Sequence, residues 1–425
     1  MNDKLNLKSD KVYVNKIWFL FFTAVFCFYT ISAVQYIVHF GILAYIFFLH
    51  LRKGSLCVKR TMLRQVLFVC GGYTLLVLWA ILSRFWSYGV MEGSITLNGM
   101  IKILAVIFCL SLYIDSQRKL DSVLLAFVYA LAVMSVLILI TSPLSTYGTT
   151  DFGGITHQFR NTIANVVFFG LILVWYLSPY FRKYESRFLV VLFLVTGLCT
   201  GSRRGIIQLA LLALLYTLTE KNLRRRVRIL LAMLLGVLIA VILLAGIPYL
   251  RETYWTRLFS IFDMSVDVAG DSDISTVGRN LYRLVGLDMF KMRPFLGFGV
   301  DGFANFLSDH PYTYSEYYLN AVYSHCNYIE LLADFGIPGF VFYYSMHVQM
   351  IKDAFRRYRS SKIARVILII VGATLVLDYG GISYQSTFAI YMYALLLIGV
   401  NLTGKKNRQG IREEETNEDL YRDRI

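Results

Sequence analysis

Charged residues and proline are both scarce in this sequence. Only 16% of its 425 residues are charged and 57% are hydrophobic. A typical soluble domain has about 25% charged residues. Six prolines is also few for this length. The composition therefore argues against a soluble enzyme and is typical of a polytopic membrane protein.

The common signatures of metal, nucleotide and hydrolase sites are missing as well. The sequence contains no H-E-x-x-H, no G-x-S-x-G, no P-loop and no Rossmann glycine run. Six cysteines are present, but none forms a C-x-x-C and four lie inside apolar runs. They predict neither a disulfide framework nor a metal site. No cofactor is expected.

Apolar runs long enough to cross a bilayer recur along the whole chain. The residues before the first run, 1–16, are too polar and too long for a cleaved signal peptide, so the first run is expected to remain as a span. A spanning helix needs about 20 apolar residues. Twelve candidates result, with a weak break at Ser32 to Tyr36 between the first two: 17–34, 35–51, 65–82, 99–114, 122–141, 162–178, 187–200, 205–219, 229–248, 327–350, 364–380 and 386–402.

The placement of positive charge orients these spans. With the N-terminus in the cytoplasm, every inside segment is basic, and together these segments hold most of the 42 lysines and arginines. This is the positive-inside pattern, so the net charge of +15 does not indicate nucleic-acid binding. The predicted fold is an all-α polytopic membrane domain, residues 1–402, of about 12 transmembrane helices in the inner (plasma) membrane with both termini cytoplasmic. The charged tail, 403–425, is expected to be disordered.

One long polar segment, residues 249–326, interrupts the helices and is predicted to lie outside. It holds nine acidic and six basic residues, which excludes a nucleic-acid surface. Pro294 and the glycines at 297, 299 and 302 indicate a turn-rich segment. The stretch from Gly278 to Lys291 has helical spacing, with an apolar side made of Leu281, Leu284, Val285, Leu287, Met289 and Phe290.

Two adjacent arginines in a short outer turn oppose the orientation rule and need a reason. Arg203 and Arg204 lie in the turn from Thr200 to Gly205. Arginine binds phosphate through a planar fork of donors and keeps its charge. The helix that begins at Gly205 adds the positive end of its dipole. The turn is therefore predicted to bind an anion, and a solvated hairpin tip is the alternative.

The long loop carries further arginines with less certain roles. Arg279 is a candidate for the same anion. For Arg283 and Lys291, salt bridges to the loop's own acidic residues, such as Asp288, are expected. Arg293 is open between these two interpretations.

The junction of the loop with the next span carries His325, followed by Asn327 and Glu330. A histidine at a membrane boundary is often only a polar cap, but its pKa near working pH also suits a general base or a group that orients a hydroxyl. Glu330 could orient His325 or cap the helix, and a carboxylate at this depth is a functional candidate. Arg160, in another outer loop, is open between a phosphate contact and a plain loop role. Asp378 is an intramembrane carboxylate to which the sequence assigns no role.

Together these residues resemble the O-antigen ligase and polysaccharide polymerase superfamily of bacterial envelopes. The resemblance covers about residues 150–350 in order, and its last block is the most specific. The matching pieces are Asn161-x-x-Ala164, Ser202-Arg203, Arg257-Leu258, Gly278-Arg279, Pro294-x-x-Gly297-x-Gly299-x-x-x-Phe303 and His325-x-Asn327-Tyr328-Ile329-Glu330-Leu331-x-x-x-x-Gly336-Ile337-Pro338-Gly339. Cys326 stands where Asn or Ser is common in the family, and Arg204 stands where the ligases more often have Gly-Ala.

The resemblance implies a C-type membrane glycosyltransferase fold and an inverting transfer at the outer face of the inner membrane. The implied donor is a glycan on undecaprenyl diphosphate. Arg203 and Arg279 would bind the lipid diphosphate, and His325 would act at the acceptor hydroxyl as the third catalytic residue. The expected substrate-binding residues are Arg204, Arg293, Arg160, Asn161, Arg257, Asn327 and Glu330.

No metal is expected, since metal-dependent enzymes of this fold place carboxylates in the first outer loop and the turn from Ser32 to Tyr36 has none. Fixed arginines supply charge stabilisation to a departing diphosphate without a metal. The partners implied are the lipid-linked glycan, membrane lipid and, for a polymerase, a possible chain-length regulator. No sequence feature indicates whether this regulator binds.

The sequence is compatible with three functions. The leading one is a polymerase of capsule, exopolysaccharide or O-antigen repeat units, because Ser202-Arg203-Arg204 and the block from Ile329 to Gly336 look more like polymerases. The second is a ligase that moves the finished glycan onto lipid A core or another surface acceptor. The third is a transporter or flippase, but the two halves of the chain show no similarity and the polar candidates cluster at the outer face.

Overall fold

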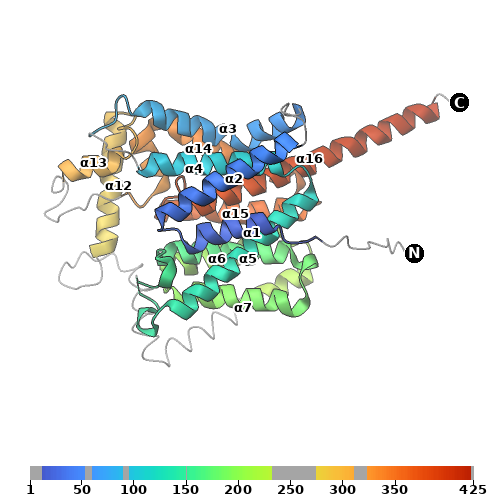
Figure 1. The fold of residues 1–425 in the computed structure, drawn as a ribbon, viewed down its shortest axis with the longest axis horizontal. Coiled ribbons are helices and arrows are strands. Elements are labelled where there is room, and N and C mark those ends of the chain that lie inside the picture. Colours follow the sequence, from blue (N-terminus) through green and yellow to red (C-terminus); the bar gives the residue numbers. More distant parts are fainter. Residues whose placement is uncertain are drawn as a thin grey trace.

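The computed structural model describes residues 12–52, 60–89, 95–149, 151–231, 274–310 and 323–422, and all regular elements within these ranges are helices. Most of them run side by side in one bundle (Figure 1). The bundle helices are α1 (Lys16–Cys27), α2 (Ser32–Arg52), α3 (Arg60–Ser83), α4 (Ile95–Tyr113), α5 (Gln117–Thr141), α6 (Arg160–Tyr176), α7 (Lys183–Cys199), α8 (Arg203–Thr219), α14 (Asn327–Arg357), α15 (Lys362–Leu377) and α16 (Thr387–Arg422).

Several of these helices have the length and composition of membrane spans. Six segments qualify: 32–52, 61–83, 95–113, 117–141, 362–380 and 387–404. Helices α1 and α6 are shorter but also apolar. The prediction of a polytopic, all-helical membrane protein is therefore confirmed over the described residues. The ninth predicted span, 229–248, lies almost entirely outside them.

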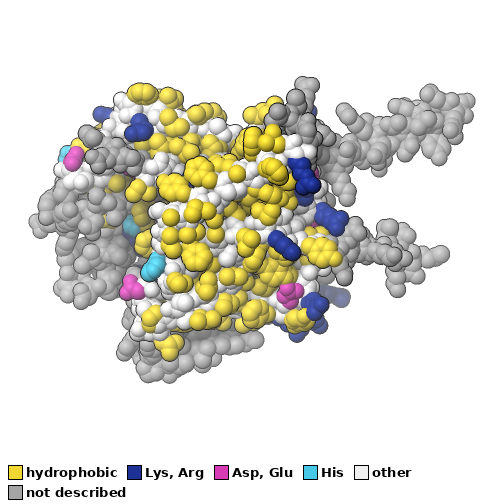
Figure 2. All heavy atoms as spheres, in the orientation of Figure 1, with side chains coloured by type: hydrophobic (Ala, Val, Ile, Leu, Met, Phe, Trp, Pro, Cys, Tyr) yellow, Lys and Arg dark blue, Asp and Glu magenta, His cyan; other side chains and the backbone are white. Residues whose placement is uncertain are grey.

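The surface of the bundle fits a lipid environment. Figure 2 shows a broad hydrophobic band along its side, with lysines and arginines gathered at the end where both termini lie. Large apolar side chains such as Phe40, Phe47 and Leu67 are exposed. In a soluble protein an apolar surface of this extent would drive aggregation, whereas in a bilayer it faces acyl chains.

Two predicted boundaries were wrong. The first helix ends at Cys27 rather than at residue 34, because the chain turns between Phe28 and Ile31. The side-chain amide of Gln35 donates to the carbonyl of Phe28 (2.9 Å), which satisfies a backbone acceptor that the turn frees from the helix.

The charged tail, expected to be disordered from residue 403, instead continues α16 as a helix to Arg422. Its composition explains this result. The tail is rich in Glu, Arg and Lys, which are all strong helix formers, and it follows directly from a spanning helix that supplies the nucleus.

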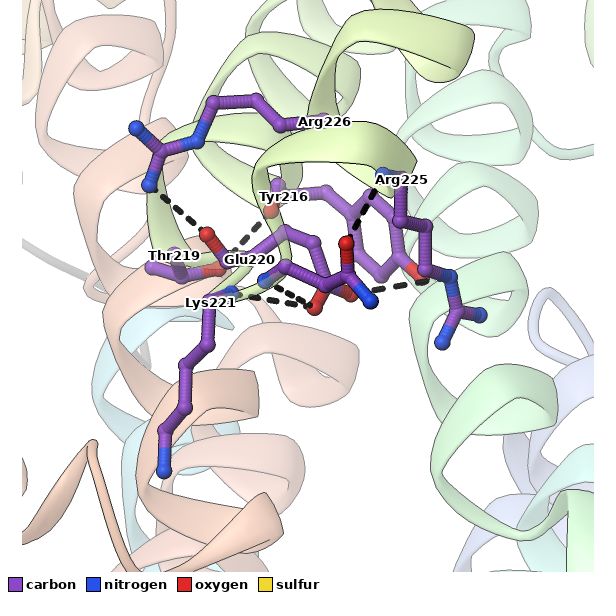
Figure 3. A network of polar contacts seen from close by, with 7 residues as sticks. Tyr216, Thr219, Glu220, Lys221, Arg225 and Arg226 are labelled. Carbon is purple, nitrogen blue, oxygen red and sulfur yellow. Dashed lines mark hydrogen bonds and ion pairs between the residues drawn. The ribbon is translucent and has the colours of Figure 1, made fainter.

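The end of α8 farther from Arg203 closes in a compact polar turn (Figure 3). The carboxylate of Glu220 accepts the backbone N–H groups of Lys221 (3.0 Å) and Asn222 (3.2 Å) and lies 3.6 Å from the guanidinium of Arg225. Arg226 donates to the Glu220 carbonyl (2.7 Å). These hydrogen bonds satisfy carbonyl and N–H groups that have no partner within the helix at the end of α8.

Two helices of the long loop, α12 (Ile274–Met292) and α13 (Gly302–Asp309), lie at the opposite end of the bundle from the termini, and α12 runs across its end (Figure 1). The helix predicted from Gly278 to Lys291 is thus confirmed. Val285 and Met289, on the inner side of α12, are fully buried, whereas Leu284, which is 53% exposed, lies on its outer side. The apolar face is therefore narrower than the spacing indicated.

Candidate functional site

The long loop is fastened to α14 by backbone hydrogen bonds. The N–H groups of Phe298 and Gly299 donate to the carbonyls of Ala333 (2.9 Å) and Asp334 (2.7 Å). Gly297 has a φ of 65° and lies so close to α14 that a Cβ atom would be 2.3 Å from the Asp334 carbonyl oxygen, so only glycine fits. This docking fixes α12 over the start of α14, which is where His325 lies.

Asp334 adds a side-chain contact to the same junction. Its Oδ1 accepts the backbone N–H of Phe303 (2.8 Å), near the start of α13. A carboxylate at the first turn of a helix satisfies an unpaired donor and favours the helix dipole. The loop helices are therefore held by both the backbone and a side chain of α14.

His325 sits in a strained turn directly before α14. Its φ of 57° places it in the left-handed region, which is uncommon for a residue with a side chain. The turn is held by Glu330, whose buried carboxylate accepts the backbone N–H of Ser324 (2.5 Å). The imidazole lies between the rings of Tyr282 (5.8 Å between centroids) and Tyr323 (4.3 Å). Glu330 thus positions His325 through the backbone.

Burial and positive charge keep His325 neutral. Burial is the larger cause and the guanidinium groups of Arg279, Arg283 and Arg204 add to it, and together they lower the pKa of His325 to about 4. Both effects disfavour the imidazolium form. At neutral pH the ring therefore has one free nitrogen lone pair that can accept a hydrogen bond from a hydroxyl. The same three arginines raise the local positive potential for an anion.

The three arginines come from segments far apart in the sequence. Arg279 and Arg283 lie one turn apart on α12, and Arg204 is the second residue of α8. The guanidinium of Arg204 lies against Gly381, where a Cβ atom would be 2.1 Å from Nη1. Arg203, the first residue of α8, is half-buried beside it. Arg204 on α8 and Arg279 and Arg283 on α12 all act electrostatically on His325.

Arg204 shares a cleft with Asp378 and Asn165, between α6, α8, α15 and the start of α16. Within the described residues, Nε of Arg204, Oδ1 of Asp378 and Oδ1 of Asn165 have no hydrogen-bond partner. Buried polar atoms of this kind normally bind water, an ion or a ligand. The cleft is therefore built to receive polar groups.

Asp378 is the functional candidate for which the sequence had no role. Its Oδ2 accepts hydrogen bonds from the hydroxyl of Tyr344 (2.8 Å) and the amide of Asn327 (3.4 Å). The carbonyl oxygen of the Asn327 side chain in turn accepts the N–H groups of Ser383 (2.8 Å) and Tyr384 (3.1 Å). The buried side chain of Asn327 thus links α14 to the turn that precedes α16 through hydrogen bonds. A carboxylate within a span was the available signal, but Arg204, which lines the same cleft, is far away in sequence.

Asn161 also has a defined structural contact. Its Oδ1 accepts the hydroxyl of Ser202 (2.7 Å), and the same hydroxyl accepts the N–H of Gly205 (3.0 Å) as the N-cap of α8. Asn161 lines the cleft of Arg204. It therefore connects the start of α6 to the turn that carries both arginines.

The remaining predicted residues have contacts away from His325. Arg160 donates to the carbonyl of Gly148 (3.3 Å), and Arg293 lies over the ring of Phe298 (4.8 Å). Arg257 is outside the described residues.

The two residues expected to form salt bridges differ. Lys291 pairs with Asp288 (2.8 Å), as predicted. Arg283 instead donates to the backbone carbonyl of Tyr379 (3.1 Å) and lies 4.2 Å from the centre of its ring. Tyr379 lies next to Asp378, so Arg283 ties α12 to the edge of the cleft.

Residues 188–344 match the family model described as O-Antigen ligase. The match covers less than half of the chain and supports a relationship to the O-antigen ligase and polymerase superfamily. The O-antigen ligase segment runs from α7 into α14 and contains Arg204, Arg279 and His325, whereas Asn161 and Asp378 lie outside it. A comparison with curated protein sequences finds no match.

Proposed function

We propose that this protein is a membrane glycosyltransferase that polymerises lipid-linked oligosaccharide units at the outer face of the inner membrane. The convergence of Arg204, Arg279 and Arg283 on a neutral His325 is the observation that carries this proposal. Three guanidinium groups around one polar site fit a diphosphate, which presents several oxygen acceptors and at least two negative charges. The neutral imidazole fits a hydroxyl group.

The transfer proceeds as a single inverting displacement. The hydroxyl oxygen of the acceptor sugar forms a bond to the anomeric carbon of the donor. The bond between that carbon and the phosphate oxygen breaks, and its electron pair leaves with the undecaprenyl diphosphate. The arginines stabilise this developing charge without reorganising, which is the main source of rate enhancement in such sites.

The proton of the acceptor hydroxyl passes to the free nitrogen of His325. In the unliganded site burial and, to a smaller extent, the arginines lower the pKa of His325 to about 4, which makes the ring a weak base. A bound diphosphate offsets their charge and therefore raises the basicity of the imidazole when the donor is in place. Proton transfer is thus coupled to donor binding.

The second candidate is a ligase that uses another surface acceptor. The description of the matched family model, O-Antigen ligase, favours this candidate. Both reactions use the same donor site. Purified full-length protein supplied with a lipid-linked repeat unit alone separates them. A ladder of products supports the polymerase. Release of lipid diphosphate only after a separate acceptor such as lipid A core is added supports the ligase.

The proposal includes the orientation of the protein in the membrane. The termini lie at the basic end of the bundle, and the site lies at the other end (Figures 1 and 2). The positive-inside rule then places the termini in the cytoplasm and His325 on the outer side. A transporter would place its polar site near the middle of the membrane, within broken helices. The loss of product with Arg279→Met, while the lipid-linked unit still reaches the outer leaflet, separates the enzyme from a flippase.

A further inference from the structure

A second cleft lies between α2, α4 and the turn before α16. The mechanism above does not use it. Its polar lining consists of Ser32, Gln35, Thr96, Lys102, Gln385 and Thr387, together with Tyr29 and His39. None of these side chains is acidic, so the one formal charge of the lining is the positive charge of Lys102.

Lys102 is placed where a lysine is costly. Lys102 lies seven residues after Ile95, the first residue of α4, which is about 10 Å along the helix axis. Helix α4 is one of the membrane-spanning segments. The ammonium group lies 4.8 Å from the centre of the Tyr36 ring, and Tyr36 is itself 46% exposed on the lipid-facing side of α2. An ionisable residue at this depth points to a ligand or a transport path.

The helix ends around the cleft strengthen the attraction for an anion. Ser32 and Thr387 are the first residues of α2 and α16, and Thr96 is the second residue of α4. The positive ends of three long helices therefore meet at the cleft that contains Lys102. Helix N-termini and a lysine together are suited to phosphate oxygens.

The second cleft lies beside the cleft of Arg204. The same short turn separates them, with Ser383 and Ser386 lining the cleft of Arg204 and Gln385 and Thr387 lining the cleft of Lys102. Ligands bound on the two sides of this turn have their polar heads next to one another. The lining of the Lys102 cleft includes the exposed side chains of Tyr29 and Ile95, so an acyl or isoprenoid chain can remain in the bilayer.

We propose that the cleft of Lys102 binds the phosphate of a lipid-linked acceptor, so that the donor and the acceptor occupy two separate lipid sites. This inference rests on the proposed function, because only a transfer between two lipid-linked substrates requires both sites. The ligand chemistry is a phosphate on a long apolar chain. A phospholipid head group offers the same chemistry, and the experiment separates the two sources.

The test is native mass spectrometry of the purified full-length protein with undecaprenyl phosphate or with phosphatidylglycerol. Wild-type protein should retain two molecules of undecaprenyl phosphate, and Lys102→Met should retain one. The affinity of the lost site should fall about tenfold or more, since hydrogen bonds to a charged group are among the strong ones. Lys102→Arg should restore it. Arg84→Met, which removes an exposed charge at the end of α3, is the matched control and should bind as wild type does.

Each outcome decides one part of the proposal. Unchanged binding of both lipids by Lys102→Met overturns the second site. Binding of phosphatidylglycerol at the Lys102 site that undecaprenyl phosphate cannot displace overturns the acceptor assignment. Steady-state kinetics distinguish the absence of the acceptor site from an error in the proposed catalytic site. Lys102→Met should raise KM for the lipid-linked acceptor about tenfold with little change in kcat, whereas Arg279→Met should lower kcat.

Discussion

The guanidinium of Arg204 and the carboxylate of Asp378 line one buried cleft, yet they form no salt bridge, and each keeps a polar atom without a hydrogen-bond partner among the described residues. Opposite charges at this depth normally pair directly. Here the space between them is left for another group. Burial lowers the pKa of Arg204, Asp378 opposes this shift, and Arg279 adds to it.

The Asp378→Asn variant should therefore separate stability from activity. The amide keeps the shape of the side chain and can still accept the hydrogen bond from Tyr344. Removing a buried charge should leave the thermal midpoint of the purified protein unchanged or raise it, as is common for functional groups. Glycan transfer should fall about tenfold or more, because Arg204 loses the charge that orients it. Equal losses in thermal stability and activity would mean that Asp378 is only structural.

Gly381→Ala should displace Arg204 without removing any charge. The added methyl group would lie 2.1 Å from Nη1, so the guanidinium must move. We expect the same loss of activity as in Arg204→Met. The double variant should be no worse than Arg204→Met alone, because both changes remove one interaction. Additive losses in steady-state assays of the three variants would contradict this link. Gly380→Ala is the matched control, since a Cβ atom at Gly380 meets nothing within 4 Å.

Glu330 should affect turnover rather than donor binding. Its carboxylate holds the N–H of Ser324 and so fixes the strained turn that carries His325. Glu330→Ala should lower kcat about 10- to 100-fold, a typical effect of a misplaced general base. Glu330→Gln, which keeps an oxygen acceptor, should recover much of the loss. The affinity for undecaprenyl diphosphate, measured by titration, should stay within a factor of about two. A large loss of affinity would place Glu330 on the donor instead.

The pH dependence of the reaction should show the coupling between His325 and the arginines. The pKa of His325 in the free enzyme is lowered to about 4 by burial and by the three guanidinium groups. The neutral ring therefore persists as the pH falls through 6.5, the ordinary value for histidine. The profile of kcat/KM reports the free enzyme and should stay level down to about pH 5. The acid limb of kcat should lie higher, because the bound diphosphate offsets the arginines. An acid limb of kcat/KM near the ordinary histidine value would contradict this environment.

The fold was predictable from the sequence because its signals are local. Apolar length and the placement of Lys and Arg located most spans, and the spacing after Gly278 located α12. Boundaries failed where a side chain decides them, as when Gln35 supports the turn at Phe28. The helical tail was missed because high charge was given more weight than helix propensity.

The site was predictable only in part, because it depends on contacts between distant segments. The motifs identified the turn of Arg203 and Arg204, the helix of Arg279 and the turn of His325. They did not show that Arg204 faces His325, since one residue along a helix changes the direction of a side chain by about 100°. Asp378 joins the same site through Arg204, which is far away in sequence and visible only in the folded chain.

The affinity of the purified protein for undecaprenyl diphosphate tests the central claim most directly. Arg204→Met and Arg279→Met should each weaken binding about tenfold or more, whereas His325→Ala should bind normally and transfer nothing. Lys291→Met is the control, because Lys291 lies on the same helix as Arg279 but pairs with Asp288 at the surface. Wild-type affinity in both arginine variants would show that the lipid diphosphate binds elsewhere.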